Sequence, residues 1–139
     1  MEDKTPSYVL DSFALLAHLQ DEPGAAQVAR LLENAKAQRV HLWMCIINFA
    51  EAMYITERER GLEKTKDTIA AVDTLPIRFV DVHRALALAA AHIKAHHPIA
   101  FADAFAVALA QEKHATIVTG DPEFKTVSDQ VSIEWLKRA

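Results

Sequence analysis

Cysteine and glycine are both scarce in this chain of 139 residues, which has one Cys and three Gly. The single Cys45 excludes an internal disulfide framework and favours a reducing, cytoplasmic setting. It lies within the apolar run LWMCIINFA, so we expect a buried, structural thiol. The three glycines, at positions 24, 61 and 120, are too far apart for the P-loop and dinucleotide-binding fingerprints, which both need closely spaced glycines.

Long hydrophobic runs and a surplus of positive charge are missing as well. The first residues, MEDKTPSYVL, lack a basic segment followed by an apolar core, and later apolar stretches are interrupted by His, Asp or Lys before they reach the length of a membrane span. We therefore expect neither export nor membrane insertion. The formal net charge of −4 argues against a surface that is basic throughout, but it does not exclude a single cleft that binds a polyanion.

About half of the residues are apolar (51%), so residues 1–139 are predicted to form a single ordered domain with a buried core. Short β-prone segments alternate with segments of helical periodicity. Strands are predicted at residues 7–10, 40–44, 77–82, 116–119 and 131–136. Helices are predicted at residues 13–19, 21–38, 47–61, 62–75, 81–97 and 101–113, with Asp81 as the N-cap of the helix that follows it. This alternation predicts an α/β fold in which helices cover both faces of a parallel sheet.

Two aspartates follow predicted strands closely. Asp11 comes directly after the first strand, and Asp121 lies two residues after the fourth, in the segment TIVTGDPEF. Ligands of open α/β sheets bind at the carboxyl ends of the strands, so both carboxylates are candidates for a site at that edge. Two simpler interpretations stay open: Asp11 as the N-cap of the next helix, and Asp121 as part of a tight turn with Gly120 and Pro122.

Glu51 is surrounded by apolar residues on one face of its predicted helix, namely Ile47, Tyr54 and Ile55. Charged groups are rarely buried without a partner, because their desolvation is costly. We therefore expect a cation or a hydrogen-bond donor beside Glu51. Asn48, one turn earlier, is a candidate for that donor or for a residue that orients the glutamate.

Asp103 lies in the first turn of the predicted helix 101–113, with Ala106, Val107 and Ala110 on the same face. A simple explanation is available here too, because the helix dipole stabilises an acid in this position by about 0.3–1 kcal/mol. However, several carboxylates that met in one cleft would repel one another, and a hard divalent cation would remove that repulsion. The sequence therefore predicts a Mg²⁺ or Mn²⁺ site formed by Asp11, Glu51, Asp103 and Asp121.

These residues, in their order along the chain, resemble a PIN domain. The motifs that carry the resemblance are Asp11-Ser12, Asn48-x-x-Glu51, FADAFAVALA around Asp103 and TGDPEF around Asp121. The resemblance covers nearly the whole chain, whose length is close to that of the small VapC-type toxins of bacterial and archaeal toxin–antitoxin pairs. It implies a three-layer α/β/α sandwich with strand order 3-2-1-4-5, which places the first and fourth strands side by side.

The resemblance also implies an activity, that of a Mg²⁺- or Mn²⁺-dependent endoribonuclease whose catalytic and metal-binding residues are Asp11, Glu51, Asp103 and Asp121. Ser12 and Thr119 match the family's small hydroxyl positions and are expected to bond a carboxylate or a water, with Asn48 as a further supporting residue. A metal-activated water would cleave an RNA phosphodiester and leave a 5′-phosphate and a 3′-hydroxyl. The segment AFADA lacks a basic residue that would help to hold the substrate.

The partners implied by the resemblance are an RNA substrate, a second copy of the chain in a homodimer, and a small cognate antitoxin. The antitoxin would lay a helix in a groove and bring a basic side chain toward the acids. Two alternatives within the same fold stay open. One is a PIN-like nuclease with a housekeeping role in RNA processing, and the other is a non-catalytic PIN fold that binds RNA or protein.

Other chemistries find less support in the sequence. His92 and His96 have the spacing of a zinc pair, but no third ligand is evident. A phosphotransferase with an aspartate nucleophile would need a second acid where Phe13 stands. The basic residues of TERERGLEKTK are candidates for an RNA track, although an ordinary solvated helix hairpin is the favoured interpretation.

Overall fold

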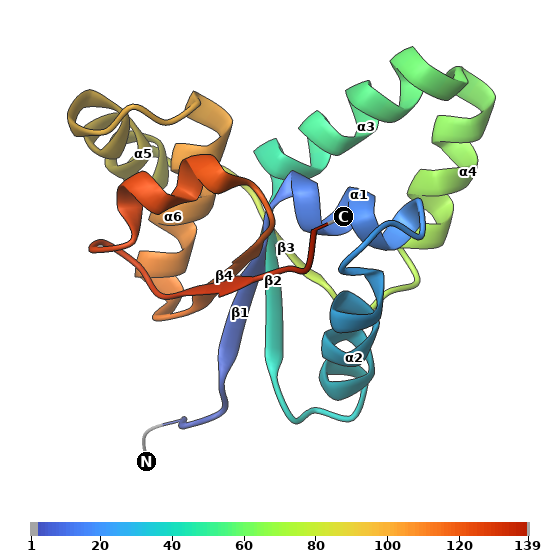
Figure 1. The fold of residues 1–139 in the computed structure, drawn as a ribbon, viewed down its shortest axis with the longest axis horizontal. Helices are drawn as coiled ribbons and strands as arrows, with labels where there is room; N and C mark the ends of the chain where they lie inside the picture. Colours follow the sequence, from blue (N-terminus) through green and yellow to red (C-terminus); the bar gives the residue numbers. More distant parts are fainter. Residues whose placement is uncertain (1–2, 139) are drawn as a thin grey trace.

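A parallel sheet of five strands forms the centre of the molecule (Figure 1). The structure is a computed structural model and describes residues 3–138. The strands are β1 (Ser7–Leu10), β2 (His41–Cys45), β3 (Arg78–Val80), β4 (Thr116–Thr119) and β5 (Ile133–Trp135). Their order is β3-β2-β1-β4-β5, and every neighbouring pair is parallel. The predicted strand order is therefore confirmed.

Helices cover both faces of the sheet, which gives the three-layer α/β/α sandwich that the sequence predicts. On one face lie α5 and α6, and on the other lie α1 to α4 (Figure 1). The bounds are α1 (Ser12–Leu19), α2 (Ala25–Lys36), α3 (Ile46–Arg60), α4 (Leu62–Val72), α5 (Arg84–His96), α6 (Phe101–Lys113) and the 3-10 helix η1 (Pro122–Val127). Within residues 3–138 none of these helices is long and apolar enough to cross a membrane.

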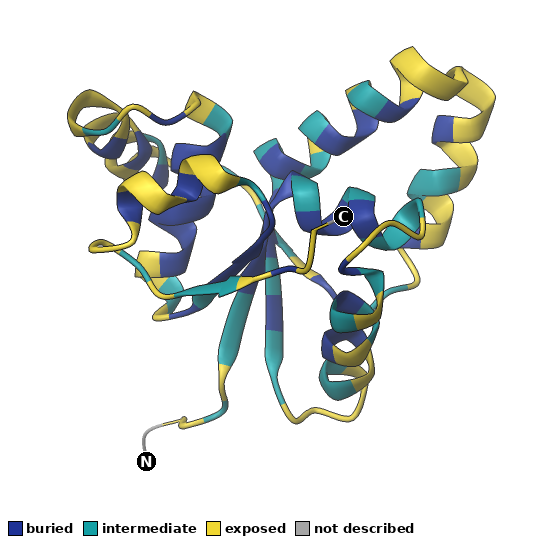
Figure 2. Cartoon of the chain, viewed as in Figure 1, coloured by how far each residue is buried: buried dark blue, intermediate teal, exposed yellow. Residues whose placement is uncertain are grey.

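Two apolar cores result, one on each face of the sheet, because successive strand residues point to opposite sides. Val9, Cys45 and Ile117 belong to the core beneath α5 and α6. Their chain neighbours Leu10 and Val118 belong to the core beneath α1 to α4. The burial pattern in Figure 2 follows this division, with buried residues on the strands and on the inner sides of the helices. Cys45 is a free, buried thiol, as predicted.

The chain leaves β1 and β4 toward opposite faces. After β1 it enters α1, whose Ala14 and Leu15 pack into one core. After β4 it enters η1, whose Phe124 and Val127 pack into the other core. Strands β1 and β4 are hydrogen-bonded neighbours, so the crevice between their carboxyl ends is the topological switch point of the sheet, where ligands bind in open α/β folds.

The structure differs from the predicted elements in two instructive places. The N-cap of α5 is His83, whose Nδ1 accepts a hydrogen bond from the backbone N–H of Leu86 at 3.2 Å. The prediction of Asp81 as the N-cap is wrong, because Asp81 is exposed and precedes the start of the helix by three residues. The helix η1 was not predicted, because Gly120 and Pro122 indicated only a tight turn.

Candidate metal centre

Asp11 links β1 to α1, and its carboxylate is bonded on both sides. Its Oδ1 accepts a hydrogen bond from the backbone N–H of Ala14 at 2.8 Å, which caps α1. Its Oδ2 accepts a hydrogen bond from the hydroxyl of Thr119, the last residue of β4. Only 1% of the residue is exposed. Asp11 is therefore a helix cap and, at the same time, a buried carboxylate at the switch point.

Thr119 connects Asp11 with Asp121. Its hydroxyl donates to Asp11 and accepts a hydrogen bond from the backbone N–H of Asp121 at 3.0 Å. One hydroxyl can make both bonds, since it has one donor and two lone pairs. Asp121 in turn caps η1, because its Oδ1 accepts from the backbone N–H of Glu123 at 2.9 Å. These bonds fix the directions of two carboxylates that follow neighbouring strands.

Glu51, on α3, has the hydrogen-bond donor that its apolar neighbours suggested. The donor is the Ser12 hydroxyl, which lies 2.5 Å from Oε1 of Glu51. Asn48 does not supply this bond, since its Nδ2 donates instead to the backbone carbonyl of Ala102 at 3.0 Å. Asn48 therefore ties α3 to the start of α6, next to Asp103. This contact depends on how two helices meet across the sheet, which the sequence pattern does not reveal.

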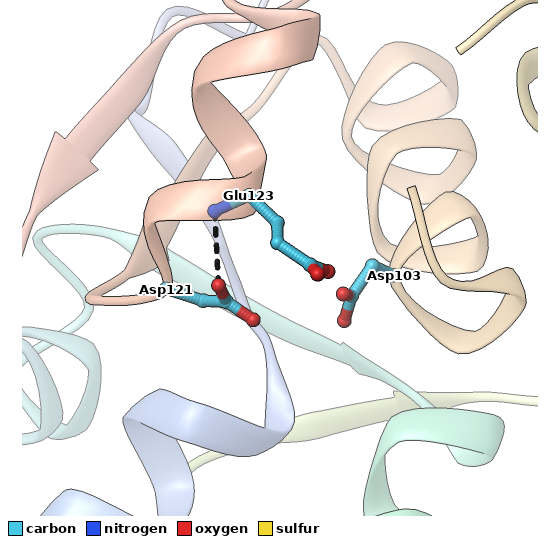
Figure 3. Close-up of side chains that lie close together, drawn as sticks. All are labelled: Asp103, Asp121 and Glu123. Carbon is cyan, nitrogen blue, oxygen red and sulfur yellow. Dashed lines mark hydrogen bonds between the residues drawn. The ribbon is translucent and has the colours of Figure 1, made fainter. Parts of the chain in front are cut away.

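Asp103, Asp121 and Glu123 form the closest group of acids in the described part of the chain (Figure 3). One oxygen of each lies within 4.8 Å of the others. Asp103 comes from the first turn of α6, and the other two come from the start of η1. Two of the four predicted acids are thus in this group, and Glu123 joins them without having been predicted. The sequence signal for Glu123 was its place two residues after Asp121 in TGDPEF.

The other two predicted acids, Asp11 and Glu51, lie outside that close group but interact with it electrostatically, Glu51 with Asp103 and Asp11 with both Asp103 and Asp121. Burial, with smaller contributions from the charges of Asp103 and Asp121, raises the pKa of Asp11 to about 7, although the hydrogen bonds from Thr119 and Ala14 oppose the rise. The cleft therefore holds mutually repelling carboxylates from α3, α6, η1 and the end of β1.

The pKa of Asp103 is raised too, and no hydrogen bond opposes the rise. Burial, followed by the charges of Asp121, Glu51 and Glu123, raises its pKa to about 7. Its carboxylate accepts no hydrogen bond from any residue in 3–138, and no Lys, Arg or His in that range forms an ion pair with any acid of the cleft. The described part of the chain thus supplies no cation to balance this charge.

A divalent metal ion fits this set of donors. All the ligand atoms are carboxylate oxygens, which hard cations such as Mg²⁺ and Mn²⁺ prefer. Such an ion would also offset the repulsion that raises the pKa of Asp103. The residues positioned to hold it are Asp103, Asp121 and Glu123, with Asp11 and Glu51 beside them.

The alternative zinc pair lacks a third ligand. The rings of His92 and His96 lie with their centroids 4.6 Å apart on α5. Within residues 3–138, however, the only group of three or more potential metal ligands is that of Asp103, Asp121 and Glu123. The geometry therefore favours the acidic cleft as the metal centre.

The fold and the site together define a class of protein: a three-layer α/β/α domain with clustered carboxylates at the switch point of a parallel sheet. The sequence model of the family described as "PIN domain" matches residues 8–130. The chain belongs to the PIN domain family. The search of curated proteins found no sequence that matches it.

Several solved structures are similar to this one over nearly their whole length. VapBC2 from Rickettsia felis, bound to a DNA fragment from its promoter, has a TM-score of 0.74 at 17% identity, covering 94% of this chain and 99% of that chain. VapBC-1 from nontypeable Haemophilus influenzae has a TM-score of 0.68 at 20% identity, covering 93% and 97%. VapC20 from Mycobacterium tuberculosis, a toxin that cleaves the sarcin–ricin loop, has a TM-score of 0.67 at 16% identity, covering 85% and 92%. At these identities the similarity establishes the fold.

Proposed function

We propose that the chain is a single PIN domain that acts as a metal-dependent endoribonuclease and as the toxin of a type II toxin–antitoxin pair. The observation that carries the proposal is the acidic cluster at the switch point, where burial and neighbouring carboxylates raise the pKa of Asp11 and of Asp103 and no cation of the described chain balances the charge. PIN-domain membership and the likeness to a sarcin–ricin-loop-cleaving toxin support RNA as the substrate.

The metal ion would be held by Asp103, Asp121 and Glu123, with Asp11 and Glu51 completing the catalytic set. When bound, Mg²⁺ or Mn²⁺ supplies Lewis-acid activation of a water and neutralises charge on the phosphodiester. The chain's own residues orient this set. Thr119 holds Asp11 and the backbone of Asp121, and Ser12 holds Glu51.

The raised pKa values give the proposed centre a dependence on pH. Near pH 7, Asp11 and Asp103 each hold a proton for part of the time, and these protons must leave before the carboxylates bind a cation. Metal affinity is therefore expected to rise with pH through about pH 7. The hydroxyl of Thr119 opposes this effect at Asp11, because it stabilises the ionised carboxylate.

The nuclease activity is tested with purified protein and a structured RNA, with a chelator, with Mg²⁺ and with Mn²⁺. We expect cleavage only with a divalent ion. Removing a residue that is only hydrogen-bonded to a metal ligand already lowers activity about 10–100-fold. Asp121→Asn, which changes a proposed ligand itself, is therefore expected to lose at least that much activity. The matched control is Asp67→Asn, which removes an exposed acid on α4. Cleavage that persists in chelator, or that Asp121→Asn leaves unchanged, would contradict the proposal and favour a non-catalytic PIN fold.

The toxin role is a separate part of the proposal. The solved relatives include VapBC pairs, two of them bound to DNA, which supports a cognate antitoxin as partner and a cytoplasmic place of action. We expect expression of the wild-type chain to arrest bacterial growth and Asp121→Asn to abolish the arrest. Co-expression of a small antitoxin encoded by a neighbouring gene should prevent the arrest. Light scattering of the purified chain tests the proposed homodimer. Metal-dependent RNA cleavage without growth arrest would indicate a housekeeping nuclease instead.

A further inference from the structure

A second hollow lies at the opposite edge of the sheet, where the strands begin. Its volume is about 420 Å³, and its lining includes Trp43, Arg78, Lys113, His41, His114 and Asp3. We refer to it as the Trp43 hollow. Strand β1 separates it from the acidic cleft: the four residues of β1, at about 3.3 Å per residue, span roughly 13 Å. None of the acids of the candidate metal centre lines this hollow.

Two cations gather around the indole of Trp43. The Lys113 Nζ lies 4.3 Å from the ring centroid, and the Arg78 Cζ lies 5.2 Å from it. The ring of His41 is also near, with its centroid 6.2 Å from that of Trp43. The indole face therefore holds an Arg and a Lys side chain at one wall of the hollow, through cation–π attraction.

These cations are only weakly engaged by acids. Arg78 forms no ion pair with any residue in 3–138, and Lys113 lies 3.8 Å from Glu112, whose other oxygen is bonded by His83 at 2.9 Å. The acid in the lining, Asp3, already accepts hydrogen bonds from His41 at 2.8 Å and from the backbone N–H of Thr5 at 2.9 Å. The positive charge of the hollow is thus available to a ligand.

Two further observations concern this edge of the sheet. The Nε1–H of Trp43 is buried and has no hydrogen-bond acceptor within residues 3–138. A neighbouring hollow of about 670 Å³ shares Arg78 and His41 with the first and adds Lys36. The basic lining thus continues around this edge, although the chain as a whole has a net charge of −4.

We propose that the Trp43 hollow binds the phosphate group of a nucleotide. Arg78 and Lys113 would donate charge-assisted hydrogen bonds to the phosphate oxygens, and the hydroxyls of Thr5 and Ser7, which also line the hollow, are further donors. The volume is in the range of small-molecule sites. The phosphate belongs either to a free mononucleotide or to an RNA strand. Binding here requires no divalent ion, so the proposal does not rest on the nuclease activity.

The test uses the full chain with Asp121→Asn, in chelator, so that neither cleavage nor metal binding contributes. The readout is the indole N–H resonance of Trp43 in a ¹H–¹⁵N spectrum, assigned by its persistence in Trp135→Phe. The probes are inorganic phosphate, adenosine monophosphate and a short single-stranded RNA. We expect the Trp43 resonance to shift in a saturable manner, while the resonance of Trp135, on the far edge strand β5, stays in place.

Variants then assign the shift to the cations. Arg78→Ala and Lys113→Ala are each expected to weaken binding by roughly tenfold or more, the usual effect of losing a charge-assisted hydrogen bond. The matched control, Lys66→Ala, removes the same charge from α4, where it lines neither hollow, and should leave binding unchanged. Far-UV circular dichroism confirms that each variant is folded, and Arg78→Glu provides a second substitution at an exposed position.

The probes also separate the two sources of phosphate. A response to adenosine monophosphate or inorganic phosphate identifies a site for free nucleotides, whereas a response to RNA alone identifies a site for the RNA backbone. The proposal is overturned if no probe moves the Trp43 resonance up to millimolar concentration. It is also overturned if Lys66→Ala weakens binding as much as Arg78→Ala does, since the attraction would then be a general effect of charge.

Discussion

Replacing Asp103 with Asn should stabilise the metal-free protein. In the folded state the pKa of Asp103 is raised from 3.8 to about 7 by burial and by neighbouring acids. At 1.36 kcal/mol for each pKa unit, this rise corresponds to about 4 kcal/mol of destabilisation once the group is fully ionised. Asp121 is half-buried and Glu123 is exposed, so solvent and ions screen some of that repulsion, and we expect Asp103→Asn to gain about 1–3 kcal/mol at pH 8 in chelator.

The sign of the pH dependence follows from the raised pKa. Between about pH 4 and pH 7 the folded state retains a proton that the unfolded state has already released, so the stability of the wild type falls as the pH rises through this range. The Asn variant lacks this titration. Its advantage should therefore be largest at pH 8 and should shrink toward zero near pH 4.

Urea unfolding followed by circular dichroism, at several pH values between 4 and 8, measures this difference. Asp67→Asn, on the exposed surface of α4, controls for the loss of one negative charge. Adding Mg²⁺ should reverse the order, because ligand binding stabilises only the protein that can bind it, and the wild type should gain more than the variant. A variant that is less stable than the wild type at pH 8 in chelator, or a gain that does not change with pH, would refute the reasoning.

Three further changes test individual contacts of the centre. Thr119→Val removes the hydroxyl that stabilises ionised Asp11, so Mn²⁺ affinity measured by calorimetry should fall about 10–100-fold. An unchanged affinity would show that this hydroxyl does not support the site. Glu123→Gln should weaken Mn²⁺ binding by about tenfold in the same assay, whereas an unaltered titration would leave Glu123 outside the ligand set. Gly120→Ala would place a Cβ 2.3 Å from Cε1 of the Phe13 ring, so the free energy of unfolding measured in urea should fall by about 1–3 kcal/mol. A variant as stable as the wild type would mean that the ring moves freely.

Much of the fold could be predicted from the sequence because the apolar periodicity changes clearly between strands and helices. The resemblance to PIN domains then supplied the strand order, which the structure confirms. The start of α5 was harder to predict, because Asp81 and His83 both precede the helix and both can accept a hydrogen bond from its first turn. The choice between them depends on where the backbone turns after β3, and only His83 makes the bond.

The site was predictable where a residue's position in an element carries the information. Asp11 and Asp121 follow strands, and Asp103 begins a helix, so the topology brings them to one edge of the sheet. Glu123 was missed because an exposed glutamate after a proline resembles any solvated turn residue, and only the 3-10 turn of η1 aims it at Asp103. The partner of Asn48 was missed because it lies 54 positions along the chain, on another helix.

The order of the acids along the chain has a consequence for biosynthesis. They are spread from Asp11 to Glu123, and the bond between Asp11 and Thr119 joins residues 108 positions apart. A ribosome-bound chain therefore carries its earlier acids without the later ones that meet them, and the cleft cannot close until residue 123 has emerged from the exit tunnel. Translation itself would thus keep the proposed nuclease inactive until the last elements have docked.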